Sequence, residues 1–159
     1  MSDDPYRLQP GHLPTPFSAI DIRAGCPPGR TVRALVLEQG RDPYVKVTRF
    51  VSGDAEGAEQ ESWTETPDGE PLTEPERRRT TWLGFQRHAS MPAATTDIAE
   101  ERIEIPACRF DCLRYTRREG DSVSTFWFAR SAPGMPLRFE ERVAGEIVFS
   151  STALEDVRG

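Results

Sequence analysis

The sequence predicts a mainly β (α+β) protein. We expect a curved antiparallel sheet or open half-barrel of about eight strands, with one helix packed on or plugging its concave face. Two observations lead to this fold class. Short runs rich in β-branched and aromatic residues recur between turn sequences from residue 31 onward. One segment, after the third run, has the pattern of a helix, whereas a doubly wound α/β protein needs a helix between most of its strands.

The 159 residues suit one domain preceded by an N-terminal arm. Residues 1–30 hold six of the 14 prolines, so regular structure cannot continue through most of this Pro-rich arm. We expect Phe17, Ile20 and Ile22 to anchor it as a short edge strand. Residues 31–159 are expected to form the single antiparallel β domain.

The first three strands are predicted at 31–38, 44–52 and 59–66. In the second of them, Lys46 and Phe50 share one face while valines occupy much of the other. A turn at 39–43 joins the first two strands as a hairpin, and the Pro-Asp-Gly turn at 67–69 closes the third, which has the polar composition of an edge strand.

A helix is predicted at about 74–89. Thr73 suits the N-cap, Pro75 suits the first turn, and Glu76 would complete a capping box with Thr73. Trp82 and Phe85 share one helical face, and the helix is expected to end before the proline at 92.

Five further strands are predicted at 98–106, 109–118, 122–130, 135–143 and 146–154. Gly120, Gly134 and Gly145 mark the turns between the last four. Apolar residues alternate with charged ones in 135–143, which is typical of an antiparallel strand with one face in water.

The net charge of −6 comes from one region, because residues 53–76 hold nine acids and no lysine or arginine. The only basic clusters, at 77–79 and 114–118, are local, so we expect no nucleic-acid partner. No apolar run is long enough for a membrane span. The N-terminal sequence lacks the basic start and apolar stretch of a signal peptide, which predicts a cytoplasmic protein.

The three cysteines, Cys26, Cys108 and Cys112, are expected to be free thiols. No CxxC pair is present, and the only histidines are His12 and His88, so we expect neither a metal site nor a cofactor. The sequence also lacks a GxSxG motif, an HExxH motif and a Gly-rich phosphate loop.

The segment 80–92, TTWLGFQRHASMP, is the most distinctive in the chain. Gly84 stands about one helical turn before His88 and leaves space beside the imidazole, while Trp82 and Phe85 supply apolar walls. A neutral histidine there could act as a general base or bind a polar head group. The alternative is a histidine that interacts with the helix C-terminus or packs in the core. In the run 126–128, Trp127 suits either an aromatic platform for a ligand or core packing.

From Trp82 to Val157 the chain resembles small bacterial proteins of unknown function related to the DUF3108 and TapB-like groups. Their pattern is a strand ending in proline, a G-x-F-D-C-x-x-Y strand, a WF strand, a P-G-x-P turn and a final tight hairpin. The matching residues are Pro106, 108–115 (CRFDCLRY, with Cys108 at the glycine position), Trp127 with Phe128, 133–136 (PGMP) and Ala144 with Gly145. The resemblance implies a fold similar to the lipoprotein-carrier type, without an established activity.

Three functions are compatible with these features. The first is a non-catalytic module that binds an apolar or amphipathic small molecule, or a partner segment, between sheet and helix; its candidate lining residues are Trp82, Phe85, His88, Tyr115 and Trp127. The second is a small enzyme of isomerase, cyclase or hydrolase type with His88 as general base, paired with Glu100, Glu101 or Cys112. The third is a protein–protein interaction module that uses an exposed strand edge. The oligomeric state is left open.

Overall fold

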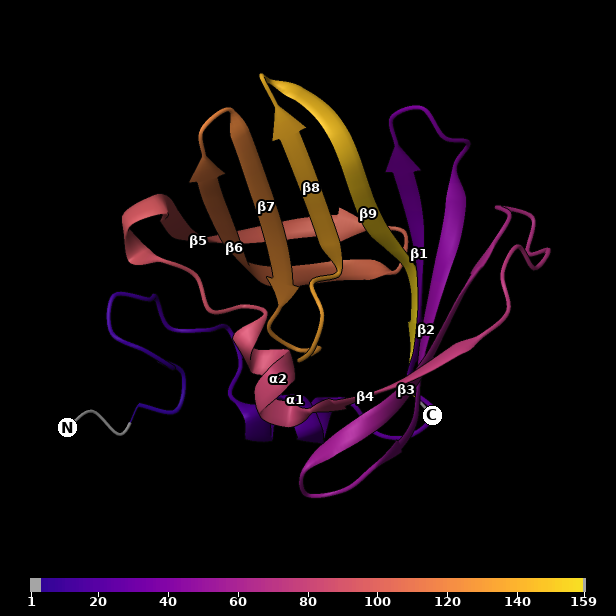
Figure 1. Ribbon diagram of the computed structural model, residues 1–159, viewed down its shortest axis with the longest axis horizontal. Coiled ribbons are helices and arrows are strands. Elements are labelled where there is room, and N and C mark those ends of the chain that lie inside the picture. The colour runs from indigo at the N-terminus through magenta and orange to yellow at the C-terminus, as the bar shows by residue number, and fades with distance from the viewer. Residues whose placement is uncertain (1–3, 159) are drawn as a thin grey trace.

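Nine strands form one antiparallel sheet in the order β4-β3-β2-β1-β9-β8-β7-β6-β5 (Figure 1). The structure is a computed structural model that describes residues 4–158. Within that range the strands are β1 (Thr31–Glu38), β2 (Tyr44–Gly53), β3 (Gly57–Glu65), β4 (Glu76–Thr81), β5 (Thr96–Ile105), β6 (Cys108–Glu119), β7 (Ser122–Ala129), β8 (Arg138–Val143) and β9 (Glu146–Val157).

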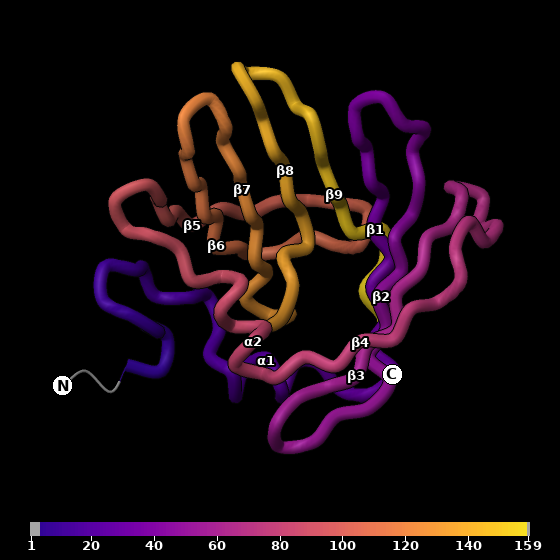
Figure 2. Tube along the Cα trace, in the orientation of Figure 1, coloured from indigo at the N-terminus to yellow at the C-terminus, as the bar shows by residue number. Residues whose placement is uncertain are grey.

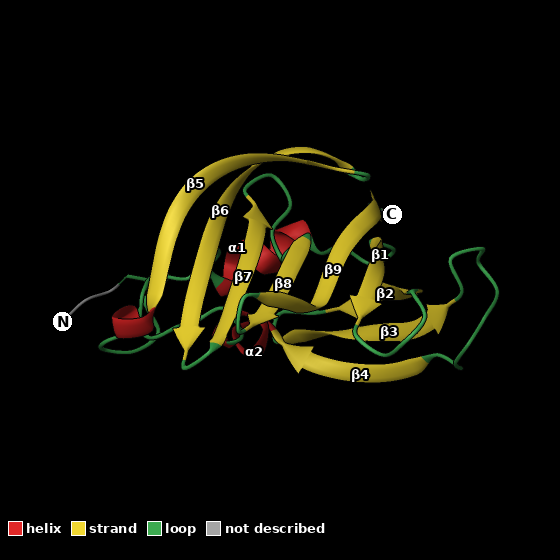
Figure 3. Ribbon diagram, turned by 90° about the horizontal axis from the view of Figure 1, so that it is seen from above, coloured by secondary structure: helices red, strands yellow, loops and turns green. Residues whose placement is uncertain are grey.

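The sheet is curved and does not close, so β4 and β5 remain its two edges. Helices α1 (Ala19–Gly25) and α2 (Trp82–Arg87) lie inside the curve (Figure 3), and a 3-10 turn, η1 (Ala93–Thr95), precedes β5. These features confirm the predicted open antiparallel half-barrel with a helix on its concave side. Among residues 4–158, no helix is long and apolar enough to cross a membrane.

The helix predicted at about 74–89 is wrong in its first half, where the chain forms β4. The reason lies in the neighbouring strand, because the arginines of β4 pair with the acids of β3: Arg77 contacts Glu61 at 3.0 Å. Cross-strand charge pairs and ladder hydrogen bonds outweigh a local capping sequence. The helix begins after Thr81 instead, whose side chain accepts a hydrogen bond from the Gly84 N–H at 2.9 Å.

The edge strand expected around residues 17–22 is also wrong, because this segment forms α1. A capping box between Ser18 and Asp21 starts the helix, with each side chain accepting a hydrogen bond from the other residue's N–H at 3.1 Å. Phe17, just before the helix, and Ile22, within it, are both buried. The N-terminal segment that precedes α1 lies beside the chain that follows α2 (Figure 2). There the Leu13 N–H donates to the Met91 carbonyl at 2.9 Å.

Two apolar clusters hold the structure together. The first packs α1 and α2 on the concave face and contains Phe17, Ile22, Cys26, Phe50, Ala58, Trp82, Ala89, Met91, Tyr115 and Phe128. The second, with Trp127 and Leu137, lies where the β5–β6 hairpin curls back toward β9. There the N–H of Ala107, in the turn of that hairpin, donates to the Ala153 carbonyl at 3.2 Å. The first cluster borders the candidate site.

Candidate functional site

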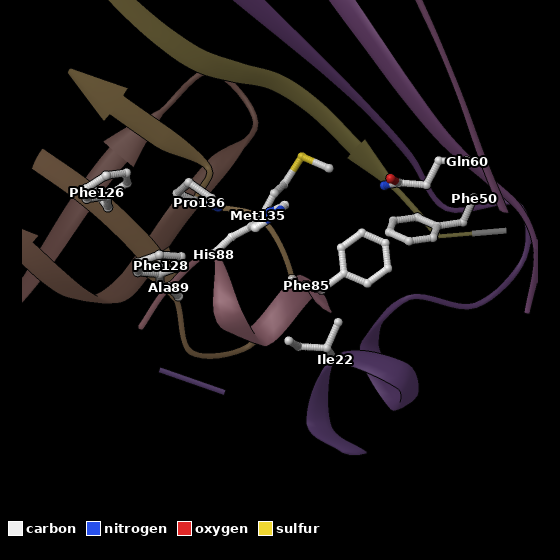
Figure 4. Close-up of a pocket in the computed structure, with 11 residues that line it drawn as sticks. Ile22, Phe50, Gln60, Phe85, His88, Ala89, Phe126, Phe128, Met135 and Pro136 are labelled. Carbon is white, nitrogen blue, oxygen red and sulfur yellow. The ribbon is translucent and has the colours of Figure 1, made fainter. Parts of the chain in front are cut away.

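A cavity of about 180 Å³ lies between α2 and the concave face of the sheet. Figure 4 shows side chains from several separate parts of the chain around it. They come from α1, from α2 and the residues just after it, from β2 and β3, from β7, and from the β7–β8 loop: Ile22, Phe85, His88, Ala89, Phe50, Gln60, Phe126, Phe128, Gly134, Met135 and Pro136.

The walls of the cavity are mainly aromatic. Phe126 and Phe128 stack on the same face of β7 with ring centroids 6.2 Å apart, because alternate residues of a strand point to the same side. On the opposite wall, the ring of Phe85 in α2 packs against the ring of Phe50 in β2, with ring centroids 6.0 Å apart. The polar side chains of the lining are Gln60 and His88. An apolar cavity of about 150 Å³ is large enough for benzene, so this one suits a single ring or a short alkyl chain.

The β7–β8 loop, which closes one side of the cavity, is held by a buried arginine. Nη1 of Arg30 donates to the carbonyl of Pro133 at 2.5 Å. Gly134 adopts φ +133°, and a Cβ there would lie 3.0 Å from the Cys26 sulfur. The positive φ and this close approach favour glycine at position 134, and the loop places Met135 at the edge of the cavity.

The cavity opens into a second, wider groove of about 870 Å³ along the concave face of β1, β2, β3 and β4. Five residues line both spaces, namely Gln60, Phe85, His88, Met135 and Pro136. The groove is more polar than the cavity, since Lys46, Thr48, Ser62 and Arg78 also border it. The two spaces together form an apolar pocket behind a polar entrance.

Two of the five candidate lining residues, Phe85 and His88, do border the cavity. Trp82 is buried behind Phe85, and its indole N–H donates to the Asp54 carbonyl at 2.7 Å. Tyr115 is buried as well, with its hydroxyl donating to the Pro14 carbonyl at 2.6 Å.

Trp127 points to the other face of β7. Its indole N–H donates to a carboxylate oxygen of Glu101 at 2.9 Å, and the guanidinium of Arg138 lies 4.9 Å from the ring centre. It packs in the second apolar cluster, away from the cavity. Core packing therefore accounts for the contacts of this aromatic residue.

Several lining residues lay outside the sequence-based candidates: Phe50, Gln60, Phe126, Phe128 and Met135. Phe50, Phe126 and Phe128 carry the alternation signal of strands, but alternation alone does not say which face meets the helix. Met135 falls in a PGMP turn, and contacts of the Pro133 carbonyl with Arg30 and Cys26 hold that turn over the cavity.

His88 is exposed at the end of α2, beside the cavity. It makes no hydrogen bond or ion pair with any residue in the described part of the chain. Its candidate partners are engaged elsewhere: Glu100 with Arg130 at 2.5 Å and Glu101 with Arg114 at 3.0 Å. Burial raises the pKa of the Cys112 thiol to about 11, which disfavours the thiolate. Among residues 4–158, therefore, no carboxylate or thiol pairs with the imidazole.

The described residues contain no group of three histidine, cysteine or acidic side chains that could hold a metal ion. A shallow hollow on the outside, near Asp111, gathers carboxylates. Each of them is paired with arginine: Asp111 with Arg102 at 2.8 Å, and the two glutamates as above. These ion pairs connect β5 to β6 and to the residue that follows β7.

Comparisons with known proteins give no family for this chain. No protein-family model and no curated protein matches it. A solved structure of a hypothetical protein from Chlamydia trachomatis is similar at 9% identity and a TM-score of 0.44, over 86% of this chain and 91% of that one. The resemblance to the DUF3108 and TapB-like groups stays a prediction.

Proposed function

We propose that the protein is a binding module that holds an apolar or amphipathic small molecule between α2 and the concave face of the sheet. The observation that carries the proposal is the cavity of about 180 Å³, whose walls include four phenylalanines and a methionine. Protein interiors are ordinarily close-packed, so an aromatic-lined space that opens to a groove is a natural site for a ligand.

The cavity also has the layout of a site for a ligand with two unlike ends. Phe126 and Phe128 lie at its apolar side, while Gln60 and His88 stand where it meets the groove. A ligand could bury a ring or alkyl chain inside and keep a polar group at the entrance. The imidazole at the entrance has no paired carboxylate or thiol in the described part of the chain, which favours binding over catalysis.

Linear alcohols test the proposal, because each buried methylene contributes about 0.8 kcal/mol. Affinity should therefore rise about fourfold per carbon from butan-1-ol to hexan-1-ol, measured by titration calorimetry. In a protein labelled at its methionine methyl groups, the NMR signal of Met135 should shift on binding. The signal of Met91, which is buried outside the cavity, serves as an internal control.

Filling the cavity should remove the binding. Ala89 is buried and lines the space, so Ala89→Leu places three extra carbons there. The same substitution at Ala94, which is exposed in η1, is the matched control and should bind as the original protein does. Equal binding by both variants, with no shift of the Met135 signal, would show that the cavity takes no ligand.

A further inference from the structure

The charges of β3 are sorted between the two faces of the sheet. Its acids occupy alternate positions on the outer face, where Glu65 pairs with Arg33 at 2.6 Å. The residues between them point inward, and they are uncharged: Gln60, Ser62 and Thr64. Although residues 53–76 are strongly acidic as a sequence, the part of β3 that faces the groove carries no charge.

The same alternation divides the three arginines of β4. Arg77 and Arg79 bond to acids, Glu61 at 3.0 Å and Asp54 at 2.9 Å respectively. Arg78 lies opposite Gln60 on the groove side and is exposed. It has no ion pair with any residue in the described range. Because Gln60 borders both the cavity and the groove, Arg78 stands beside the junction of the two spaces.

A second cation faces the same groove. Lys46, the only lysine of the chain, lies opposite Ala34 of β1 and Thr64 of β3 and is exposed. It too has no ion pair within residues 4–158. The acid that lines the groove is Glu76, and the remaining lining arginine, Arg77, is neutralised by its own glutamates. Although the protein has a net charge of −6, the described residues that line the groove include two unpaired cations and one acid.

We infer that the groove receives an anionic head group, a carboxylate or a phosphate, on an amphipathic ligand whose apolar end occupies the cavity. This inference rests on the proposed function. Arg78 is the principal contact, because its planar guanidinium can donate two parallel hydrogen bonds to either head group. Lys46, farther along the groove, adds attraction for the same charge.

Ligands with one chain and different head groups test the inference. Octanoate and octyl phosphate should bind at least about fivefold tighter than octan-1-ol, and octylammonium should bind more weakly than the alcohol. The preference for anions should fall as the salt concentration is raised from 20 to 300 mM, because salt screens the attraction between exposed charges. The tighter of the two anions identifies whether a carboxylate or a phosphate fits better, and a preference for either supports the inference.

Arg78→Gln should lower the affinity for octanoate about three- to tenfold, because it deletes one charge-assisted contact. The affinity for octan-1-ol should stay the same. Arg79→Gln is the matched control, since it removes an arginine of the same strand that pairs with Asp54 and does not line the groove, so it should preserve the preference. Both substitutions lie on an exposed edge strand, and matching unfolding midpoints would show that each variant folds.

The outcomes separate the two levels of the proposal. If octan-1-ol binds as tightly as octanoate, the head-group inference fails while the apolar pocket stands. If the anion preference persists in Arg78→Gln, the assignment of the head group to this arginine is overturned. If neither the octyl ligands nor hexan-1-ol binds, both the inference and the proposed function fail. If hexan-1-ol binds and the octyl ligands do not, the head-group inference fails while the apolar pocket stands.

Discussion

Arg30 and Asp156 form a buried two-point ion pair that joins the start of β1 to the end of β9. Nε of Arg30 donates to Oδ1 of Asp156 at 3.0 Å, and Nη2 donates to Oδ2 at 2.9 Å. Only 1% and 7% of the two side chains are exposed. The third guanidinium nitrogen donates to the carbonyls of Gly25 and Pro133, so one side chain connects α1, the sheet and the loop over the cavity.

Asp156→Asn should therefore destabilise the protein and disturb the cavity together. Removing one partner of a buried ion pair costs about 3–5 kcal/mol, because the other charge stays buried without compensation. Urea unfolding should show this loss. The Met135 methyl signal should also broaden or move as its loop loosens. Glu155→Gln, one residue away in an exposed 3.8 Å pair with Arg33, is the control and should change stability by less than about 0.5 kcal/mol. A similar effect of both variants would contradict the role of the buried pair.

Tyr115→Phe should destabilise the contact between β6 and the N-terminal segment. It leaves the Pro14 carbonyl without its 2.6 Å hydrogen bond, at a cost of about 1–2 kcal/mol near pH 8. Unfolding by urea measures this difference directly. Tyr6→Phe provides the control, because that hydroxyl bonds to Asp21 at the surface and its loss should cost less.

The stability difference between the original protein and Tyr115→Phe should also depend on pH. Burial raises the pKa of the Tyr115 phenol to about 12, from an ordinary value of 10.0. Above pH 10 the unfolded chain loses this proton while the folded protein keeps it, so the free energy of unfolding falls as the pH rises toward 12. Phenylalanine has no such proton, and the difference should shrink between pH 9 and 11. A constant difference over that interval would show that the phenol titrates alike in both states.

The three thiols should react at very different rates. Cys108 is exposed, whereas Cys26 and Cys112 are buried. Burial raises the pKa of the Cys26 thiol, and it raises the pKa of the Cys112 thiol to about 11. With Ellman's reagent at pH 8, one thiol should react at once and two only after denaturant is added. In Cys108→Ser the fast phase should disappear; a second fast thiol would mean that the core opens readily.

Gly57→Ala should weaken the junction of β3, β4 and α2. A Cβ at this position would lie 2.4 Å from the Thr80 carbonyl oxygen and 2.8 Å from the Thr81 Cα, both of them backbone atoms that cannot rotate away. Overpacking of this kind costs about 1–3 kcal/mol, which a shift in the urea midpoint would report. Ser62→Ala, on the same strand, should be nearly neutral. Equal stability of Gly57→Ala and the original protein would show that β4 can move outward.

Much of the sheet could be predicted because its signals are local. The strand Thr31–Glu38 has the predicted bounds, and the last hairpin turns at the expected Ala-Gly pair. Both depend on alternation and turn residues that lie next to each other in the chain. Two segments were mispredicted: β4, whose arginines needed the acids of β3 as partners, and α1, whose capping box lay hidden in a Pro-rich region.

The candidate site shows the same division. Phe85 and His88 could be placed near a pocket from the sequence alone. They belong to one short segment in which Gly84 leaves space beside the imidazole. Phe50 and Met135 could not, because 35 and 50 residues of chain separate them from Phe85. Their approach depends on sheet order and on the contact between Arg30 and the Pro133 carbonyl.

The sequence by itself determined a curved antiparallel sheet with a helix that includes Trp82 and Phe85, because side-chain alternation and turn residues act over a few positions. Tertiary structure alone decided which face of each strand became concave. The helices pack on one side of the sheet, and that side becomes concave. As a result the acids of β3 lie on the outer face, whereas Lys46 and Arg78 face the groove. A net charge of −6 therefore describes the chain, whereas the entrance to its pocket is basic.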